Sequence, residues 1–243
     1  MLKAIIFDCD GVLVDTERDG HRVGFNRAFA QFGIDAEWDV PLYGKLLQVA
    51  GGKERMRAYF DEYGWPAGAG SDEAKDTLIK DLHKAKTEIT AGLVAGRARP
   101  LRPGISRIVD EAIAAGVKLG VGTASNPRFI DAVLDLFGPE RKANFGFVHA
   151  GDCVARQTPA PALYELAKRS LGLPVEQCVV IEDSRNGLLA AKSAGLPCLI
   201  TTSTYTVDED FSEADRVVPK LGDAPHVNIT LADLGELAAE FAA

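Results

Sequence analysis

The stretch that decides the fold is residues 2–17, which read LKAIIFDCDGVLVDTE. Its apolar residues 2–7 indicate a short buried strand, and Gly11 then interrupts the strand pattern. Asp8 and Asp10 lie two positions apart at the end of that strand, so both carboxylates point the same way. In open α/β sheets, ligands bind in the crevice beyond the carboxyl ends of the strands. We therefore expect the carboxylate pair to form part of a ligand site.

Two crowded carboxylates repel each other unless a cation or a shared proton relieves them. A hard divalent ion such as Mg²⁺, which prefers oxygen ligands, is suited to such a pair. The alternative interpretation is a solvated acidic turn, as many Asp-Gly turns are. The position of Asp8 and Asp10 directly after a buried apolar strand favours the metal site.

The composition is that of an ordinary soluble globular protein. The chain has 243 residues, of which 47% are hydrophobic and 26% are charged. That length suits one large domain or a core domain that carries a smaller one. The net charge of −8 argues against a general affinity for nucleic acid or anionic membranes, while a local basic pocket stays compatible with it. We expect a monomer that binds a small molecule.

The cysteines and the start of the chain indicate a reducing compartment. Cys9, Cys153, Cys178 and Cys198 show no CxxC spacing, which disfavours zinc and predicts free thiols, with Cys9 packed in the core. The chain opens directly into a strand without a signal peptide, and no apolar run approaches the roughly 20 residues of a membrane span. We therefore expect a cytoplasmic protein with no membrane partner.

Helical and strand patterns alternate from about Gly104 onward. This alternation predicts βαβ units and a doubly wound, mostly parallel α/β sheet, to which the first strand also belongs. The predicted strands are residues 2–7, 117–121, 145–148, 178–181 and 197–200. The predicted helices are residues 105–115, 126–137, 160–171 and 184–194. Residues 1–15 and 100–243 would form this core domain.

Residues 16–99 contain almost no strand-like alternation and predict a separate helical domain. Amphipathic helices are expected at residues 22–32, 54–63 and 72–90, with Trp38 and Trp65 in their core. The insert leaves and returns beside the crevice that holds Asp8. We therefore expect a small all-helical cap, inserted after the first strand, that can close over a substrate.

Three further segments follow strands and so reach the same sheet edge as Asp8. Residues 122–126, GTASN, bring a hydroxyl and backbone N–H groups to a helix start, which is either an anion cradle or a plain N-cap. Glu182 and Asp183 either complete a metal site with Asp8 or cap the next helix. Residues 151–161 are the third segment, where a phosphate site would benefit from a cation.

Together these segments resemble the haloacid dehalogenase superfamily of aspartate-nucleophile phosphotransferases over essentially the whole chain. Residues 8–16, DCDGVLVDT, match its first motif, Thr123 its second, and Glu182-Asp183 in VIEDSRNGLLAAKSAG its fourth. Within the superfamily the chain is most similar to CbbY-like sugar bisphosphate phosphatases. That likeness rests on GGKERM at 51–56, LHKAKT at 82–87 and LRPG at 101–104. The first and fourth motifs are highly specific for the superfamily, and the cap segments moderately specific for the subgroup.

The resemblance implies a division of labour between the two aspartates. Asp8 would attack the phosphoryl group and form an aspartyl-phosphate, while Asp10 would act as general acid and then as general base. This division needs Asp8 ionised and Asp10 able to hold a proton. Mg²⁺ would bind Asp8, the backbone carbonyl of Asp10 and Asp183, with Glu182 supporting an outer-shell water. The Thr123 hydroxyl would help to bind the phosphoryl group.

The resemblance also implies a set of substrate-binding residues: Asp15, His21, Lys53, Arg55, Lys86, Thr87, Arg102, Ala124, Ser125 and Asn126. From the pattern alone, Lys53 and Arg55 are either surface charges at a helix start or part of a phosphate-binding turn that follows Gly51-Gly52. Lys86 and Thr87 are typical of a solvated mid-helix face. Arg102, in the returning linker, is a candidate for holding a second phosphate. His21, in the outgoing linker, is expected either to pack in the hinge or to contact substrate or Asp10.

One position departs from the family pattern. The family's third motif supplies a lysine just before a Pro-x-Pro stretch, and here residue Thr158 stands before Pro159-Ala160-Pro161. A neutral hydroxyl cannot offset the charge of the transferring phosphoryl group. Losing one charge-stabilising donor typically costs about 3–4 kcal/mol, or two to three decades in rate. Either the activity is weak, or another cation such as Arg156 serves, or the chain has a binding role.

The sequence thus predicts a Mg²⁺-dependent phosphatase for a small sugar bisphosphate, such as xylulose-1,5-bisphosphate, an inhibitory by-product of Rubisco in the Calvin cycle. One alternative is a sugar phosphate mutase of the β-phosphoglucomutase type, in which the phosphoryl group returns to sugar instead of water. A second alternative, motivated by Thr158, is a catalytically impaired ligand-binding protein. A dehalogenase is disfavoured because that chemistry needs neither Asp10 nor a metal.

Overall fold

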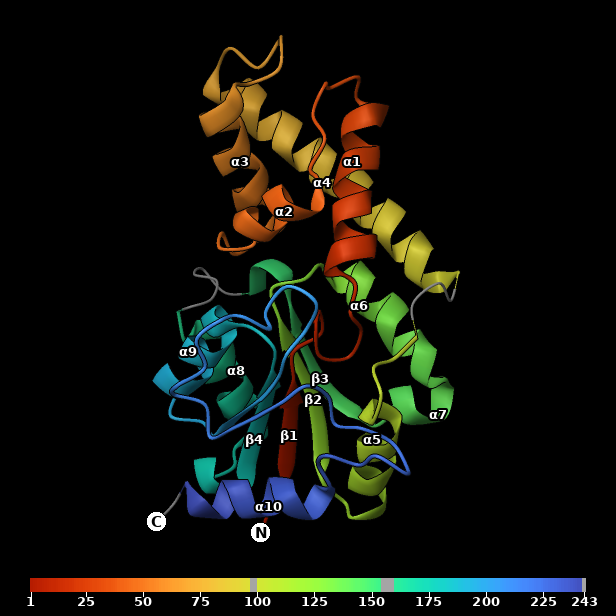
Figure 1. Cartoon of the computed structure of the whole chain (residues 1–243), viewed down its shortest axis with the longest axis vertical. Helices are drawn as coiled ribbons and strands as arrows, with labels where there is room; N and C mark the ends of the chain where they lie inside the picture. Colours follow the sequence, from red (N-terminus) through yellow and green to blue (C-terminus); the bar gives the residue numbers. More distant parts are fainter. Residues whose placement is uncertain (97–99, 154–159, 242–243) are drawn as a thin grey trace.

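A computed structural model describes residues 1–96, 100–153 and 160–241. In these residues an all-parallel, six-stranded sheet carries helices on both faces, and a group of helices lies beyond one end of the strands (Figure 1). The strands are β1 (Ala4–Phe7), β2 (Lys118–Thr123), β3 (Phe145–Ala150), β4 (Cys178–Glu182), β5 (Cys198–Thr201) and β6 (Arg216–Val218). Their spatial order is β3-β2-β1-β4-β5-β6.

The first strand lies in the middle of the sheet. Phe7 of β1 pairs with Val121 of β2 on one side and with Ile181 of β4 on the other. All four side chains of β1 are buried, as expected for a parallel strand that is covered on both faces. The chain first adds strands on one side of β1 and then on the other, which makes the carboxyl end of β1 a topological switch point. Ligands bind at such points in open α/β sheets.

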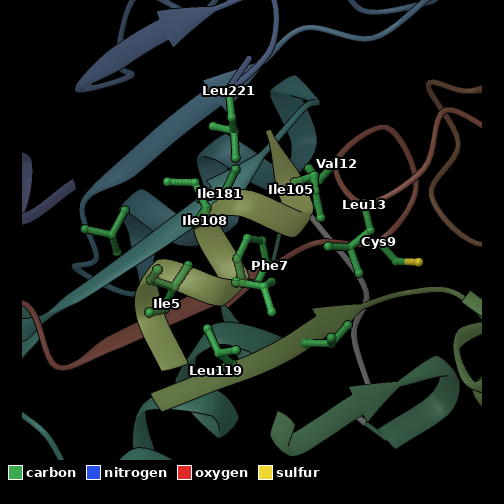
Figure 2. Close-up of a cluster of buried hydrophobic side chains, with 14 of the residues drawn as sticks. Ile5, Phe7, Cys9, Val12, Leu13, Ile105, Ile108, Leu119, Ile181 and Leu221 are labelled. Carbon is green, nitrogen blue, oxygen red and sulfur yellow. The ribbon is translucent and has the colours of Figure 1, made fainter. Parts of the chain in front are cut away.

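Two hydrophobic clusters cover the two faces of the sheet. The first contains Ile5 and Phe7 of β1 and joins them to α5 (Ile105–Ala114), α6 (Pro127–Leu134) and α10 (Leu231–Glu240). Figure 2 shows part of this cluster around Phe7, with the buried Cys9 beside it. The second cluster contains Ala4 and Ile6 and joins them to α8 (Ala162–Leu171) and α9 (Arg185–Ser193). Because alternate β1 side chains point to opposite faces, one short strand serves both clusters.

The helices between Glu17 and Ala95 form what we call the cap. They are the π-helix η1 (Glu17–His21), α1 (Arg22–Gln31), α2 (Val40–Leu46), α3 (Gly52–Tyr63) and α4 (Asp72–Ala95). Their own apolar cluster is built on aromatic rings, with Phe25, Phe29 and Trp38 in mutual contact. Trp65 packs against this cluster, half-buried. The cap lies over the carboxyl ends of the strands (Figure 1).

The predicted fold class, a doubly wound parallel sheet with a helical insert after the first strand, is confirmed. Several elements escaped the sequence pattern: η1, α2, α10, β6 and the short α7 (Pro139–Lys142). The predicted 72–90 helix continues to Ala95, and the predicted 126–137 helix ends at Leu134 before a 3₁₀ turn. The proposed domain boundary at 99/100 adjoins residues 97–99, which lie outside the described part. None of the described helices is long and apolar enough to cross a membrane.

Candidate active site

Four carboxylates and a hydroxyl meet at the carboxyl ends of the strands. Asp8 and Asp10 follow β1, Thr123 ends β2, and Glu182 ends β4, with Asp183 next in the chain. All five line one cavity beneath the cap. The sheet order therefore brings the first, second and fourth sequence motifs to one place, as a parallel sheet requires.

Asp8, Glu182 and Asp183 form a compact acidic cluster. One carboxylate oxygen from each lies within 4.8 Å of the others. Burial raises the pKa of Asp8 well above its usual value, and the charges of Glu182, Asp183 and Asp10 raise it further. Burial and the charge of Glu182 also raise the pKa of Asp183 well above its usual value. Buried, mutually repelling carboxylates are a donor set that fits a hard divalent cation such as Mg²⁺.

Close packing fixes the two acidic residues at the end of β4, Glu182 and Asp183. The Glu182 carboxylate accepts hydrogen bonds from the Tyr164 hydroxyl at 2.5 Å and from the Asp183 backbone N–H at 3.0 Å. Gly11 has a φ of +81° and lies so close to the Asp183 carboxylate that a side chain at position 11 would collide with it. The glycine that interrupted the strand pattern thus allows the β1 loop to approach Asp183.

Asp10 has different neighbours from Asp8. Its carboxylate accepts hydrogen bonds from His21 Nε2 at 2.6 Å and from the hydroxyls of Thr16 and Ser125. Burial alone raises the pKa of Asp10, but the attraction of His21 and these three hydrogen bonds lower it to about 2. The order of the two pKa values is therefore opposite to the one that the predicted roles need. The reason is that Asp10 has three donors, whereas Asp8 lies among other carboxylates.

His21 and Lys86 extend this contact into the cap. Lys86 Nζ donates a hydrogen bond to His21 Nδ1, and the His21 ring packs on Phe129 of α6 with centroids 4.6 Å apart. Of the two expectations for His21, contact with Asp10 is observed together with packing at the hinge. The solvated interpretation of Lys86 is wrong, because α4 turns this side chain into the cavity and buries it. Burial lowers the pKa of Lys86 to about 8.

Arg55 is the second cation of the cavity. Its Nη1 donates to the Tyr43 hydroxyl at 3.1 Å and its Nε to the Leu46 carbonyl at 3.1 Å, while the Tyr43 hydroxyl donates to Glu17. The interpretation of Arg55 as a surface charge is wrong, because the residue is buried. Thr87 also lines the cavity and is buried, which its sequence pattern did not indicate.

The segment after β2 also lines the cavity. Ala124, Ser125 and Asn126 all border the cavity. The Asn126 side chain accepts from the Arg128 backbone N–H at 2.9 Å and so caps α6. The Ser125 hydroxyl donates to Asp10 instead of capping the helix. The helix-cap interpretation of this segment is therefore confirmed at Asn126, and the anion cradle stays a prediction.

Three predicted substrate-binding residues lie away from the cavity wall. The Arg102 guanidinium donates to backbone carbonyls of core loops, at Gly11, Thr201, Thr202 and Pro219. Its donors are used within the core, so its predicted contact with a second phosphate is not supported. Lys53 borders a separate hollow between α3 and α4. The Asp15 carboxylate accepts from the Thr204 hydroxyl at 2.5 Å.

Some cavity residues were not singled out from the sequence. They are Glu17, Asn186, Ser203, Tyr205 and Glu209. Ser203 and Tyr205 come directly after β5, at the same sheet edge as Asp8, so their strand-end position was an available signal. Glu17 comes directly after the first motif and begins η1, an element that the sequence did not predict. Thr158 and Arg156 lie outside the described residues.

Comparisons with known proteins agree with this geometry. A model of the haloacid dehalogenase-like hydrolase family matches residues 2–195. A CBBY-like protein of Arabidopsis thaliana is 49% identical over 237 residues, covering 97% of this chain and 74% of the relative. Protein CbbY of Cereibacter sphaeroides is 40% identical over 225 residues, covering 92% of this chain and 94% of the relative.

Solved structures give the same result. The crystal structure of CbbY from Rhodobacter sphaeroides with phosphate superposes with a TM-score of 0.86 at 40% identity, covering 96% of this chain and 99% of the other. A variant of that CbbY, solved in complex with xylulose-1,5-bisphosphate, matches equally well, with a TM-score of 0.86. A β-phosphoglucomutase from Clostridium difficile, at 21% identity and a TM-score of 0.76, shares the fold. The chain therefore belongs to the haloacid dehalogenase-like hydrolases, among the CbbY-like proteins, and is a phosphoric monoester hydrolase of that family.

Proposed function

We propose that the chain hydrolyses one phosphate of a small sugar bisphosphate in the presence of Mg²⁺. The observation that carries this proposal is the charge arrangement of the cavity. The half-buried Asp8 and the buried Glu182 and Asp183 line it with carboxylates from the core, and the buried cations Arg55 and Lys86 line it from the cap. A ligand with a metal-bound phosphate at one end and a free phosphate at the other would satisfy both groups.

The reacting end lies at Asp8. An Asp8 carboxylate oxygen would form a bond to phosphorus while the bond from phosphorus to the sugar oxygen breaks, giving an aspartyl-phosphate. Asp10 would give a proton to the leaving sugar oxygen and later take one from the attacking water. Because His21 and two hydroxyls hold the pKa of Asp10 to about 2, these contacts have to loosen when substrate binds if Asp10 is to carry a proton.

Mg²⁺ would be held by Asp8, the Asp10 backbone carbonyl and Asp183, with Glu182 orienting an outer-shell water. When bound, the cation supplies positive charge that offsets the negative charge of the transferring phosphoryl group. The Thr123 hydroxyl hydrogen-bonds Asp8 and would hold the phosphoryl group from the β2 side. Glu182, fixed by Tyr164, is held for its supporting role before any ligand arrives.

The other end of the substrate would be held by the cap. Arg55 and Lys86 provide the charges, with Thr87 as a neighbouring hydroxyl on α4. Ser125 and Asn126 would contact the sugar from the segment after β2. Arg102 is left out of this set, because its guanidinium is already bonded to four backbone carbonyls of the core.

The identity of the sugar is proposed from a relative. A CbbY that is 40% identical to this chain was crystallised with xylulose-1,5-bisphosphate, which makes a pentulose bisphosphate the first substrate to test. The rate depends on residue 158, where threonine replaces the lysine of the family's third motif. We expect turnover to be slow, because the described cavity residues of the core include neither lysine nor arginine.

The test is phosphate release from a panel of sugar monophosphates and bisphosphates, with Mg²⁺ and with a chelator. We expect release from pentulose bisphosphates, only with Mg²⁺, and a lower kcat/KM for the matching monophosphates. Turnover in the chelator, or equal kcat/KM for monophosphates and bisphosphates, would contradict the proposal. Tight binding of a bisphosphate by calorimetry without any phosphate release would assign the chain a binding role instead.

A further inference from the structure

The segment after β5 reaches from the core toward the cap. We call residues 202–206 the β5 loop; in Figure 1 it is part of the blue chain above the sheet, next to the base of the cap. Its base is tied to the core, because Arg102 Nη2 donates to the Thr202 carbonyl at 2.7 Å. Its middle is tied as well, since the Thr204 backbone N–H and hydroxyl both donate to Asp15 Oδ2. The loop is therefore a fixed part of the core.

Tyr205 extends from this loop into the cap. Its ring meets the ring of Tyr43 on α2 edge to face, with centroids 5.7 Å apart and an interplanar angle of 63°. A methyl group at Gly44 would lie only 3.3 Å from the same ring, so α2 has a glycine where the ring covers it. Tyr205 also packs against the cap's aromatic cluster. A side chain of the core thus forms part of the hydrophobic packing of the cap.

The contact is made by the ring and not by the hydroxyl. The Tyr205 hydroxyl oxygen is buried without a hydrogen-bond partner among the described residues. A buried hydroxyl without a partner carries a desolvation cost and adds no attraction. Edge-to-face ring pairs, in contrast, stabilise a contact beyond the area that they bury. Phenylalanine at this position should therefore hold α2 as well as tyrosine does.

The partner of Tyr205 leads directly to a cation of the cavity. The Tyr43 hydroxyl accepts a hydrogen bond from Arg55 Nη1 at 3.1 Å, and the Arg55 guanidinium carbon lies 5.4 Å from the centre of the Tyr43 ring. The Arg55 Nε donates to the carbonyl of Leu46, the last residue of α2. Arg55 is thus oriented by α2, and α2 is covered by Tyr205.

We propose that Tyr205 is a positioning residue: its ring fixes α2 of the cap against the core and thereby sets the position of Arg55 in the cavity. The proposal rests on the proposed function only in its kinetic consequence. Substrates that need the cap cation, such as a sugar bisphosphate, depend on Tyr205. A small phosphate ester that reacts at Asp8 without reaching the cap does not.

The test compares Tyr205→Ala and Tyr205→Phe with the wild-type chain, and uses Tyr63→Ala as the matched control. Tyr63 is an exposed cap tyrosine that stacks on Tyr59 and does not line the cavity. Hydrogen–deuterium exchange of the α2 amides reports on the position of α2 without any substrate. Kinetics with Mg²⁺, on xylulose-1,5-bisphosphate and on para-nitrophenyl phosphate, report on the consequence.

For Tyr205→Ala we expect exchange in α2 to become about tenfold faster, and KM for the bisphosphate to rise about tenfold at similar kcat. The kcat/KM for para-nitrophenyl phosphate should stay within about twofold of the wild-type value, since no cap contact is lost. Tyr205→Phe and Tyr63→Ala should match the wild type in both measurements. If Tyr205→Phe keeps the wild-type α2 exchange and KM, the ring and not the hydroxyl is the part of Tyr205 that positions α2.

Unchanged α2 exchange in Tyr205→Ala would overturn the proposal, as would equal losses on both substrates, which would indicate damage to the core. Loss of α2 protection in Tyr63→Ala would also overturn it. If the wild-type chain cleaves para-nitrophenyl phosphate but not the bisphosphate, the substrate named above is wrong. The exchange experiment then still decides whether Tyr205 positions α2.

Discussion

The two sides of the active-site cavity are built in opposite ways. The core side presents Asp8, Glu182 and Asp183 from the ends of neighbouring parallel strands. The cap side presents Arg55 and Lys86 from the helices α3 and α4. The core side thus collects negative charge at the ends of strands, whereas the cap side collects positive charge on helices that contact other cap helices: Arg55 contacts α2, and Lys86 contacts His21 of η1.

Burial acts against the charge on both sides. It raises the pKa of Asp8 and Asp183 well above their usual values, and it lowers the pKa of Lys86 to about 8. At Lys86 the charges of Glu17 and Asp10 offset part of the effect of burial. Each side is therefore stabilised by a ligand of the opposite sign, a cation at the core side and a phosphate at the cap side. The following predictions test this difference.

The largest effect is expected from Asp8→Asn. Loss of the nucleophile should lower kcat by at least about 10⁴-fold. The same change removes one charge from the buried acidic cluster, so the melting temperature without metal should rise, while stabilisation by added Mg²⁺ should shrink. Phosphate release and thermal unfolding with and without Mg²⁺ measure both effects.

The control for this change is Asp110→Asn, which alters an exposed ion pair with Arg141 far from the cavity. It should leave kcat and the Mg²⁺-dependent rise in melting temperature unchanged. Turnover by Asp8→Asn near the wild-type rate would show that another group is the nucleophile. A lower melting temperature without metal would contradict the account of the core side as a cluster of unrelieved charge.

The second-largest effect is an expected increase in kcat. Thr158→Lys restores the cation of the family's third motif, and we expect kcat to rise by about two to three decades. A neutral substitution of similar length, Thr158→Gln, separates charge from size and should give no such gain. An unchanged rate in Thr158→Lys, with the wild-type chain already fast, would mean that another cation serves the core side. If neither the wild-type chain nor Thr158→Lys shows activity, the result would favour a ligand-binding role for the chain.

The third effect concerns Arg102, which the sequence predicts to bind substrate and whose guanidinium bonds carbonyls of the core in the structure. Arg102→Lys keeps the charge but loses the planar donors that bind several carbonyls, which should lower the free energy of unfolding by about 2 kcal/mol. The KM values for bisphosphate and monophosphate should then shift together. A rise in KM for the bisphosphate alone, at unchanged stability, would restore the second-phosphate role. Arg128→Lys, in an exposed ion pair with Glu88, is the control.

The core side could be predicted from the sequence and the cap side only in part. Asp8 and Glu182 each follow an apolar strand directly, so local pattern fixes their place once the sheet is parallel. Lys86 is different, since its burial depends on His21, which lies 65 positions earlier in the chain. The spacing of α4 shows which residues share a face, but not which helix covers that face. The contacts of Arg102 could not be predicted for the same reason, because its carbonyl partners come from loops up to 117 positions away.

The smallest effect is the pH dependence of phosphate binding at the cap side. Because burial lowers the pKa of Lys86 to about 8, this lysine loses its proton in the folded chain above that pH. Inhibition by inorganic phosphate, a dianion above about pH 7.5, should therefore weaken about fivefold between pH 8 and pH 9. Unfolding cannot mimic this loss. Between pH 8 and 10.5 the unfolded chain binds more protons at Lys86 than the folded chain does, so the contribution of Lys86 to the free energy of unfolding rises with pH.

Two variants separate Lys86 from the other groups that titrate in this range. Lys86→Arg keeps its charge at every pH used, so its inhibition constant should stay flat from pH 7.5 to 9.5. Lys53→Arg, in the separate hollow between α3 and α4, should keep the wild-type profile. A flat wild-type profile, or the same weakening in Lys86→Arg, would show that the cap cation is not the group that binds phosphate. The charge contrast between the two sides would then have to rest on Arg55 alone among the described cavity residues.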